Sequence, residues 1–136
     1  MDIEIFALCD AATDYHGKLN LLGTFDAIWT KEMPLVQPQC AVALRLRFSR
    51  IEEGEHRIKI NIVDEDGKLV APSLDANTKL DFSNRPETSV AINMILNLQR
   101  LKFEKYGEYS VELAFDGRHE ASLPIHIRKP PDEAIL

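Results

Sequence analysis

Apolar and polar side chains alternate with a period of two residues over most of this chain. The clearest run spans residues 109–128, where two alternating segments flank Asp116-Gly117, a dipeptide suited to a tight hairpin turn. Such alternation places one set of side chains in a core and the other in solvent. The inward set comprises Tyr109, Val111, Leu113 and Phe115 before the turn, and Ala121, Leu123, Ile125 and Ile127 after it. Two antiparallel strands are therefore expected here.

The same alternation predicts a second hairpin from residues 42–48 and 58–62. Its inward side chains are Val42, Leu44, Leu46, Phe48, Ile58, Ile60 and Ile62. Its outward side chains include four cations that should lie near one another, namely Arg45, Arg47, Arg57 and Lys59. This basic patch could bind a phosphate, a carboxylate-bearing partner or an acidic strand. The alternative is a solvated face whose cations pair with glutamates such as Glu112.

The first strand, residues 3–10, is expected to be apolar on both faces. Ile3 and Ile5 lie on one face, and Phe6 and Leu8 lie on the other. A strand of this kind is either central in a sandwich or covered by a partner chain. Phe6 and Leu8 are therefore the candidate interface residues.

Other segments predict further strands. Residues 18–30 form either a pair of strands or one long strand bent at Gly23, so that Phe25, Ala27 and Trp29 face a different sheet from Leu19 and Leu21. The proline-rich segment 33–38 crosses between sheets. Residues 75–82 read as a short edge strand. Residues 88–98 fit a strand better than the competing helix, because the apolar positions recur every second residue.

About eight such strands predict an all-β protein with an immunoglobulin-like antiparallel β-sandwich. Tyr109 is either the tyrosine of a tyrosine corner, with its hydroxyl bonded to upstream backbone, or a plain strand residue. One domain is expected over residues 1–129. A tail follows over residues 130–136, in which Ile135 and Leu136 could dock on a partner.

Composition narrows the function classes. The 136 residues include 22 acidic and 16 basic side chains, which argues against binding to nucleic acid or to an anionic membrane. The chain starts without the pattern of a signal peptide and has no apolar run of about 20 residues. A cytoplasmic protein is expected, with Cys9 and Cys40 as free thiols.

Candidate chemistry is sparse. The four histidines have no short ligand spacing to one another or to a cysteine, so no metal site is expected. Asp64-Glu65-Asp66-Gly67 resembles the start of a calcium loop, but Asp75 stands where the bidentate glutamate is needed, which favours a plain turn. No nucleophile elbow or glycine-rich phosphate loop occurs, so no catalytic residue and no cofactor is expected.

One longer motif carries a family resemblance. Residues 17–26 read Gly-Lys-Leu-Asn-Leu-Leu-Gly-Thr-Phe-Asp, and the proline loop, Asp64–Gly67 and the Gly107-x-Tyr109 hairpin follow. This pattern resembles a bacterial family of small cytosolic proteins of unknown function. The resemblance implies a β-sandwich over nearly the whole chain, and it implies no activity, cofactor or catalytic residue.

Two functions from different classes remain. The first is a non-catalytic interaction or self-assembly module, whose partner is another copy or another protein. The second is a sandwich that binds a small anion or a carbohydrate, either through the basic patch or through the loops near Tyr15 and Trp29, whose aromatic rings could stack on a sugar. An enzyme is not expected, because no convergent polar site can be assembled from the sequence.

Overall fold

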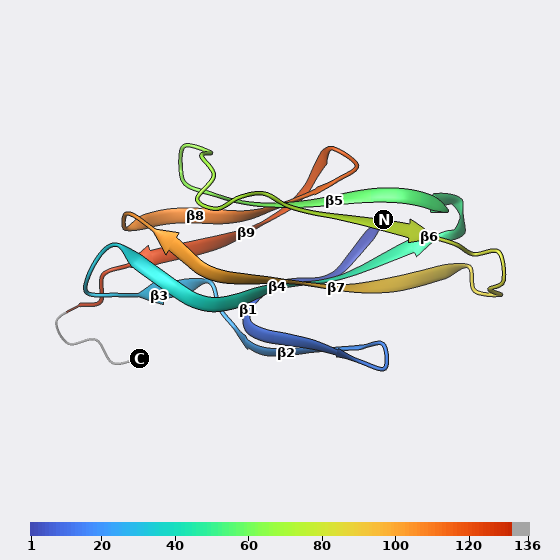
Figure 1. The fold of residues 1–136 in the computed structure, drawn as a ribbon, viewed down its shortest axis with the longest axis horizontal. Helices are drawn as coiled ribbons and strands as arrows, with labels where there is room; N and C mark the ends of the chain where they lie inside the picture. The colour runs from blue at the N-terminus through green and yellow to red at the C-terminus, as the bar shows by residue number, and fades with distance from the viewer. Residues whose placement is uncertain (132–136) are drawn as a thin grey trace.

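The computed structural model describes residues 1–131 and is built from two β-sheets packed face to face (Figure 1). The four-stranded sheet has the order β2-β1-β4-β7, with β1 Asp2–Tyr15, β2 Lys18–Thr24, β4 Leu35–Ser49 and β7 Ser89–Phe103. The five-stranded sheet has the order β3-β9-β8-β5-β6, with β3 Ala27–Trp29, β5 Gly54–Val63, β6 Leu74–Leu80, β8 Gly107–Phe115 and β9 Arg118–Arg128. No helix in this part of the chain could cross a membrane. The predicted all-β sandwich is confirmed, with nine strands in place of about eight.

The core lies between the two sheets. It combines every second residue of β4, which are Cys40, Val42, Leu44, Leu46 and Phe48, with the inward residues of β5, β8 and β9. These side chains are the ones that the period-2 pattern assigned to a core, and most are at or below 3% exposure. Burying each large aliphatic or aromatic side chain contributes about 1.5–3 kcal/mol before entropy is counted.

The β8–β9 hairpin forms as predicted. Its turn residues, Asp116 and Gly117, both have positive φ angles, of 49° and 82°. A two-residue turn with two positive φ angles matches the twist of the strands it joins, and glycine adopts this conformation at little cost. The hairpin therefore closes where Asp116-Gly117 stands in the sequence.

The bend at Gly23 is also confirmed, because β2 and β3 belong to different sheets. Gly23 has a φ angle of 67°, and a Cβ there would lie 2.5 Å from Asp10 Oδ2. Beyond the bend, Phe25 N donates to Leu8 O, and His126 N donates to Asp26 O. The chain thus leaves the four-stranded sheet and joins the edge of the five-stranded sheet, where β3 runs parallel to β9.

The predicted pairing of residues 42–48 with residues 58–62 is wrong. β4 pairs with β1 and β7, whereas β5 pairs with β6 and β8 in the other sheet. The 3-10 helix η1, Arg50–Glu52, joins them, and Glu52 closes a capping box on Ser49. This turn carries the chain across the sandwich, so the apolar faces of the two strands meet through the core and not side by side.

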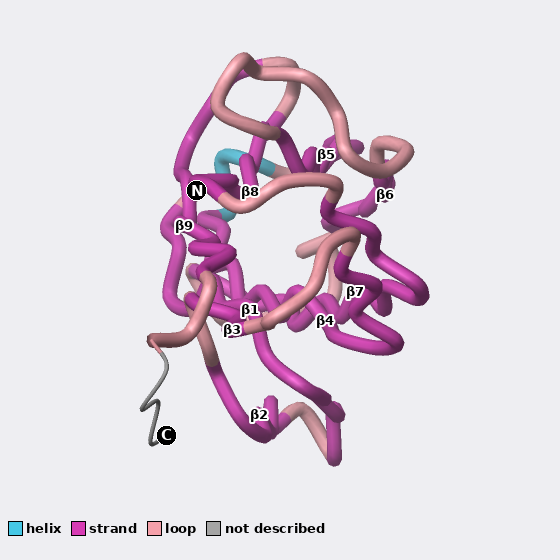
Figure 2. Tube along the Cα trace, turned by 90° about the vertical axis from the view of Figure 1, so that its left-hand side faces the viewer, coloured by secondary structure: helices cyan, strands magenta, loops and turns pink. Residues whose placement is uncertain are grey.

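The hairpin of β1 and β2 projects from the outer face of the four-stranded sheet (Figure 2). Its apolar side chains Ala12, Leu19 and Leu21 pack with Ile95 over a small cluster of Cys9, Ala41 and Ala43. Cys40 faces the main core, so the two free cysteines lie on opposite faces of one sheet. Burial, with Cys9 and Asp10 nearby, raises the pKa of the Cys40 thiol to about 11, which makes it a poor nucleophile at neutral pH.

Tyr109 forms the tyrosine corner. Its hydroxyl donates a 2.7 Å hydrogen bond to the backbone carbonyl of Lys105, four residues upstream. Its ring packs edge-on against Phe103, with ring centroids 4.8 Å apart. The corner therefore fixes the connection between β7 and β8, which belong to different sheets.

Replacing Tyr109 with phenylalanine should lower the free energy of unfolding by about 0.5–1.5 kcal/mol, because the ring stays packed while one buried hydrogen bond is lost. Urea denaturation measures the change. Tyr106→Phe is the matched control, since the Tyr106 hydroxyl also donates to a backbone carbonyl, that of Thr30, but from a side chain that is 39% exposed. Equal losses in the two variants would contradict a structural role for the corner.

Candidate functional site

The four cations of the predicted basic patch do not lie together. Arg45 and Arg47 are on β4, and Arg57 and Lys59 are on β5, so the two pairs sit in different sheets. All four alternate with buried residues, which places them on the two opposite outer faces of the sandwich. The patch was predicted because β4 and β5 were expected to pair as a hairpin. Since they do not pair, the four cations do not form one patch.

Arg45 and Arg47 share one carboxylate of the neighbouring strand. Glu4 on β1 accepts from Arg45 Nε at 2.8 Å and from Arg47 Nε at 2.5 Å. The pKa of Glu4 is lower than its ordinary value, and the hydrogen bond from Arg47 is the largest cause. The same contact raises the pKa of Arg47. Arg45 and Arg47 also donate to Asn93 Oδ1 and Ser89 Oγ on β7. These guanidinium groups therefore brace three strands together.

The other two predicted ligand-binding residues lie on an open surface. Arg57 Nε is 3.4 Å from Asp75 Oδ1 on β6, and the Arg57 side chain is 65% exposed. Lys59 lies two residues further along β5, opposite Asp75 in the strand register. Glu112, which was expected to pair with these cations, instead contacts His119. The local balance of charge leaves little attraction for an anion.

Phe6 and Leu8, the predicted interface residues, both face the core. Leu8 is only 4% exposed and belongs to the main core cluster, and Phe6 is half-buried against it. The inner face of β1 packs against the main core, and Cys9 on its outer face lies in the small cluster with Leu19 and Leu21, so apolar residues occur on both faces. Phe6 and Leu8 line an open groove of about 380 Å³ together with Phe25, Leu123 and Pro124. Leu8 is thus a core residue and not a surface contact.

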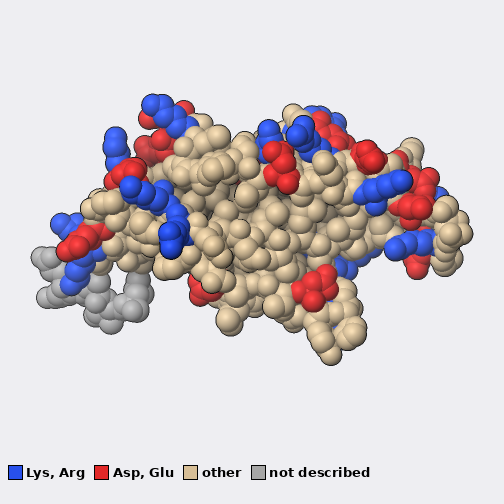
Figure 3. Space-filling model, in the orientation of Figure 1, with Lys and Arg blue, Asp and Glu red and all other residues tan. Residues whose placement is uncertain are grey.

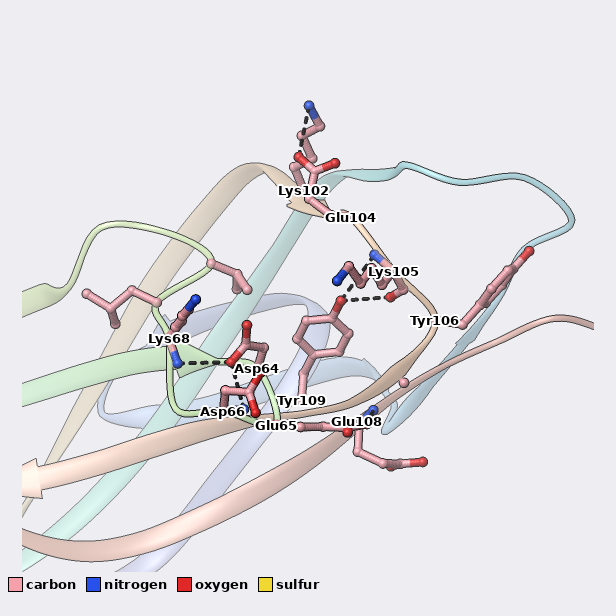
Figure 4. A pocket seen from close by; sticks show the side chains of 13 residues that line it. Asp64, Glu65, Asp66, Lys68, Lys102, Glu104, Lys105, Tyr106, Glu108 and Tyr109 are labelled. Carbon is pink, nitrogen blue, oxygen red and sulfur yellow. Dashed lines mark hydrogen bonds and ion pairs between the residues drawn. The ribbon is translucent and has the colours of Figure 1, made fainter.

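A cavity of about 560 Å³ lies at one end of the sandwich, between the loop after β5 and the β7–β8 corner (Figure 4). Asp64 is occupied in holding its own turn, because its Oδ1 atom accepts from the backbone N–H groups of Asp66 and Lys68, each at 2.9 Å. Residues 64–67 therefore form a turn. The charged side chains around the cavity are Asp64, Glu65, Asp66, Glu104, Glu108, Lys68, Lys102 and Lys105. Because acidic and basic side chains both line this cavity, its charge does not favour an anionic or a cationic ligand.

The sequence reading missed one polar cluster, on the outer face of the five-stranded sheet. His119 Nε2 lies 2.8 Å from Glu112 Oε2 and 3.0 Å from Ser122 Oγ, and Ser122 Oγ also donates to Glu112. Burial raises the pKa of Glu112, but the hydrogen bonds from Ser122 and His119 outweigh it, and the net pKa is lowered. In a hydrolase triad the two imidazole nitrogens serve different partners, whereas here Nε2 meets both. The arrangement therefore does not activate the serine.

Metal ligands are not gathered in the described part of the chain. Within residues 1–131, no group of three or more His, Cys, Asp or Glu side chains could hold a metal ion. His119 and His126 each contact a glutamate, and His56 contacts Asp116. The histidines thus take part in separate side-chain pairs.

The free edge of β7 is the most unusual surface of the described structure. β7 pairs with β4 along its whole length and is the last strand of its sheet. From Ser89 to Gln99 it carries no charge and no proline. Its inward residues Ile92, Met94 and Leu96 pack against the core but are only partly buried. An edge that is long, uncharged and apolar is a ready template for another strand.

The other open edges of the two sheets each carry features that discourage pairing with another chain. These features are Asp2 and Glu4 in the first half of β1, Lys18 and the bent Gly23 in β2, Asp75 and Lys79 in β6, and Arg118, Glu120 and Pro124 in β9. Charged side chains, prolines, bends and short length are the usual protection of edge strands. β7 lacks this protection over residues 89–99.

The surface view agrees with this contrast. β6 and β7 lie one above the other along the same side of the sandwich (Figures 1 and 2). In the orientation of Figure 1, charged side chains lie at the two ends and along the upper and lower margins of the molecule, and the band between these margins is largely free of them (Figure 3). The sequence reading identified residues 88–98 as a strand, but the edge position of that strand follows only from the sheet order.

No curated protein matches the chain in sequence. A family model does match, over residues 4–128, and its family has no known function. The match covers nearly all of the sandwich, from β1 to the end of β9. The chain therefore belongs to the family of unknown function DUF6941, in agreement with the expected membership of a family without known function.

Proposed function

We propose that this protein is a non-catalytic module that assembles with further copies of itself. The observation that carries the proposal is the unprotected edge of β7, residues 89–99, because the open edges of β1, β2, β6 and β9 are protected and the remaining edge strand, β3, is only three residues long. An open edge of this kind binds a strand through backbone hydrogen bonds, which do not require a pocket or a cofactor. The chemistry of assembly thus rests on the sheet itself.

Binding of a small anion or carbohydrate is the weaker alternative. One basis was a joint patch of Arg45, Arg47, Arg57 and Lys59, and these residues are divided between two faces. The other was the aromatic rings of Tyr15 and Trp29, which are exposed but lie on strands of different sheets. Arg45 and Arg47 already share Glu4, and Arg57 contacts Asp75. A catalytic role has similarly little support, since the Glu112–His119–Ser122 cluster lacks the geometry that activates a nucleophile.

The proposal includes two finer assignments. The sandwich is assigned as immunoglobulin-like, supported by the Tyr109 hydroxyl bonded to Lys105 O, because this corner recurs in such sandwiches. A cytoplasmic location is supported by Cys9 and Cys40, two buried thiols that face opposite sides of one sheet and do not form a disulfide.

Sedimentation equilibrium of the full chain in reducing buffer tests the proposal. We expect a mass of at least two chains that falls toward one chain on dilution, as mass action requires of a reversible assembly. Raising the salt concentration should lower this mass only modestly, because the contact surface is uncharged over residues 89–99 and charges flank it only at its ends, at Glu87 and Arg100. A mass of one chain at every concentration would refute self-assembly.

A further inference from the structure

We propose that the partner of β7 is the β7 strand of a second copy, paired antiparallel about a two-fold axis near Asn93. This inference deepens the proposed function and rests on it. The pairing would join two four-stranded sheets into one continuous sheet of eight strands, with β7 of each copy at the centre. A two-fold dimer uses the same segment on both chains, so it closes and leaves no further open edge at this site.

The length of the available edge sets the position of the axis. Pro86 precedes the strand, and Arg100, with a φ angle of 54°, interrupts its regular backbone. Toward the carboxyl end, residues 97–102 share a pocket with Val70, Ala71 and Pro72 of the loop after β5 and with Leu74 at the start of β6. The open stretch therefore runs over about residues 89–97, and its midpoint is Asn93.

With the axis at Asn93, apolar residues on the same face of the two β7 strands lie opposite each other. On the inner face Ile92 would lie opposite Met94, and Val90 would lie opposite Leu96 of the other copy. On the outer face Ala91 would lie opposite Ile95. A shift by one residue would place inward side chains opposite outward ones, so the alternation of the strand constrains the register. The inner residues are only partly buried in one chain, and the second strand would cover them further.

The charges at the two ends of β7 favour an antiparallel second copy. Glu87 lies just before the strand, and Arg100 lies near its carboxyl end. Antiparallel pairing about Asn93 brings Glu87 of each copy next to the segment that contains Arg100 of the other copy. Parallel pairing would instead bring like charges together. The edge is thus complementary to itself, in apolar pattern and in charge, which is the reason for choosing a second copy over an unrelated strand.

Met94→Lys tests the pairing directly. In a single chain the lysine can extend past the open edge into water, but a second strand would bury its ammonium group, a device by which natural edges avoid pairing. We expect sedimentation equilibrium to give the mass of one chain for this variant, with the far-UV circular dichroism of the native protein. Ala76→Lys places the same charge on a partly buried position of β6, the edge strand of the other sheet, and should retain the native mass.

A charge-reversal pair provides a second test that leaves the strand intact. Glu87→Lys should weaken dimerisation at least about threefold at low salt, because it places like charges across the interface. Adding Arg100→Glu to the same chain should restore the affinity, and high salt should remove both effects. A purely structural role of Glu87 would not be rescued by the second substitution.

The outcomes separate the two proposals. If the native chain has the mass of one chain at every concentration, self-assembly and the β7 pairing both fail. If the native chain assembles and Met94→Lys assembles equally well, the β7 pairing is overturned while self-assembly stands. If Met94→Lys does not fold, absence of rescue in the Glu87→Lys, Arg100→Glu chain overturns the pairing, and rescue supports it.

Discussion

Phe48→Ala should lower the free energy of unfolding by about 3–5 kcal/mol, the largest loss expected from a single substitution here. Phe48 is completely buried on β4. Its ring lies 5.7 Å from that of Phe115 on β8 and 5.9 Å from that of His56 on β5, measured between centroids. Removing the Phe48 ring leaves a cavity between the two sheets, which the surrounding side chains can fill only in part. Urea denaturation followed by circular dichroism measures the change.

Ile51→Ala is the control for this substitution. Ile51 lies in η1, three residues away, and is 91% exposed, so its truncation creates no cavity. We expect a change of less than about 0.5 kcal/mol. A loss below about 1 kcal/mol for Phe48→Ala would mean that the contact between the sheets at this position is not a tightly packed core.

The alternation of apolar residues predicted the local structure well, because it depends only on which side chains need burial. Tyr109, Val111 and Leu113 are buried as expected, and Asp116-Gly117 forms the turn. The bend at Gly23 was also predictable, since its positive φ angle and its close approach to Asp10 both require glycine. In these places the residue itself determines the backbone.

The pairing of strands was not predictable in the same way. Leu46 and Ile58 face the core in either arrangement, whether β4 and β5 are hydrogen-bonded neighbours or lie across the core from each other. The connection between them decides the arrangement, and its four residues from Arg50 to Glu53 include a 3-10 turn that forms a capping box with Ser49. Short connections of this length serve hairpins and sheet-to-sheet crossings alike. The wrong prediction of a single basic patch follows from this ambiguity.

The candidate site depends on the same long-range information. Residues 89–99 read as a strand from sequence, but whether that strand is central or at an edge depends on the order of the sheet. The pairing of Arg45 and Arg47 with Glu4 joins residues more than 40 positions apart. Burial patterns carry no signal for contacts of this kind on outer faces, where the polar side chains alternate in the same way on every strand.

His56 forms a latch at the end of the sandwich where β5 begins. Its Nδ1 atom lies 2.7 Å from Asp116 Oδ2, and its Nε2 atom lies 2.5 Å from the backbone carbonyl of Glu52. A carboxylate and a carbonyl only accept hydrogen bonds, so both ring nitrogens must donate, which only the imidazolium can do. Burial lowers the pKa of His56, but Asp116 and Glu52 outweigh it and raise the pKa above its ordinary value. The protonated ring thus ties η1 to the β8–β9 turn.

This latch should make stability depend on pH. Because the pKa of His56 is raised in the folded chain, its contribution is full below about pH 6.5, the value of an unfolded histidine, and is lost as the pH rises through the folded pKa. The pKa of Asp116 is lowered, first by the N–H of Arg57 and then by His56, so its contribution is lost only in acid, below about pH 3.8. The latch is therefore strongest between these two values.

His56→Gln should lower the free energy of unfolding by about 1.5–3 kcal/mol at pH 5.5, because hydrogen bonds from a charged donor are lost. The difference from the native chain should shrink toward pH 9, where the native imidazole is neutral and one nitrogen faces an acceptor without a proton. Urea denaturation at a series of pH values measures this trend. His119→Gln is the control, since the His119 side chain is 61% exposed beside Glu112. A deficit in His56→Gln that stays constant from pH 5.5 to pH 9 would show that His56 contributes by packing against Phe48 and Phe115, and not by its charge.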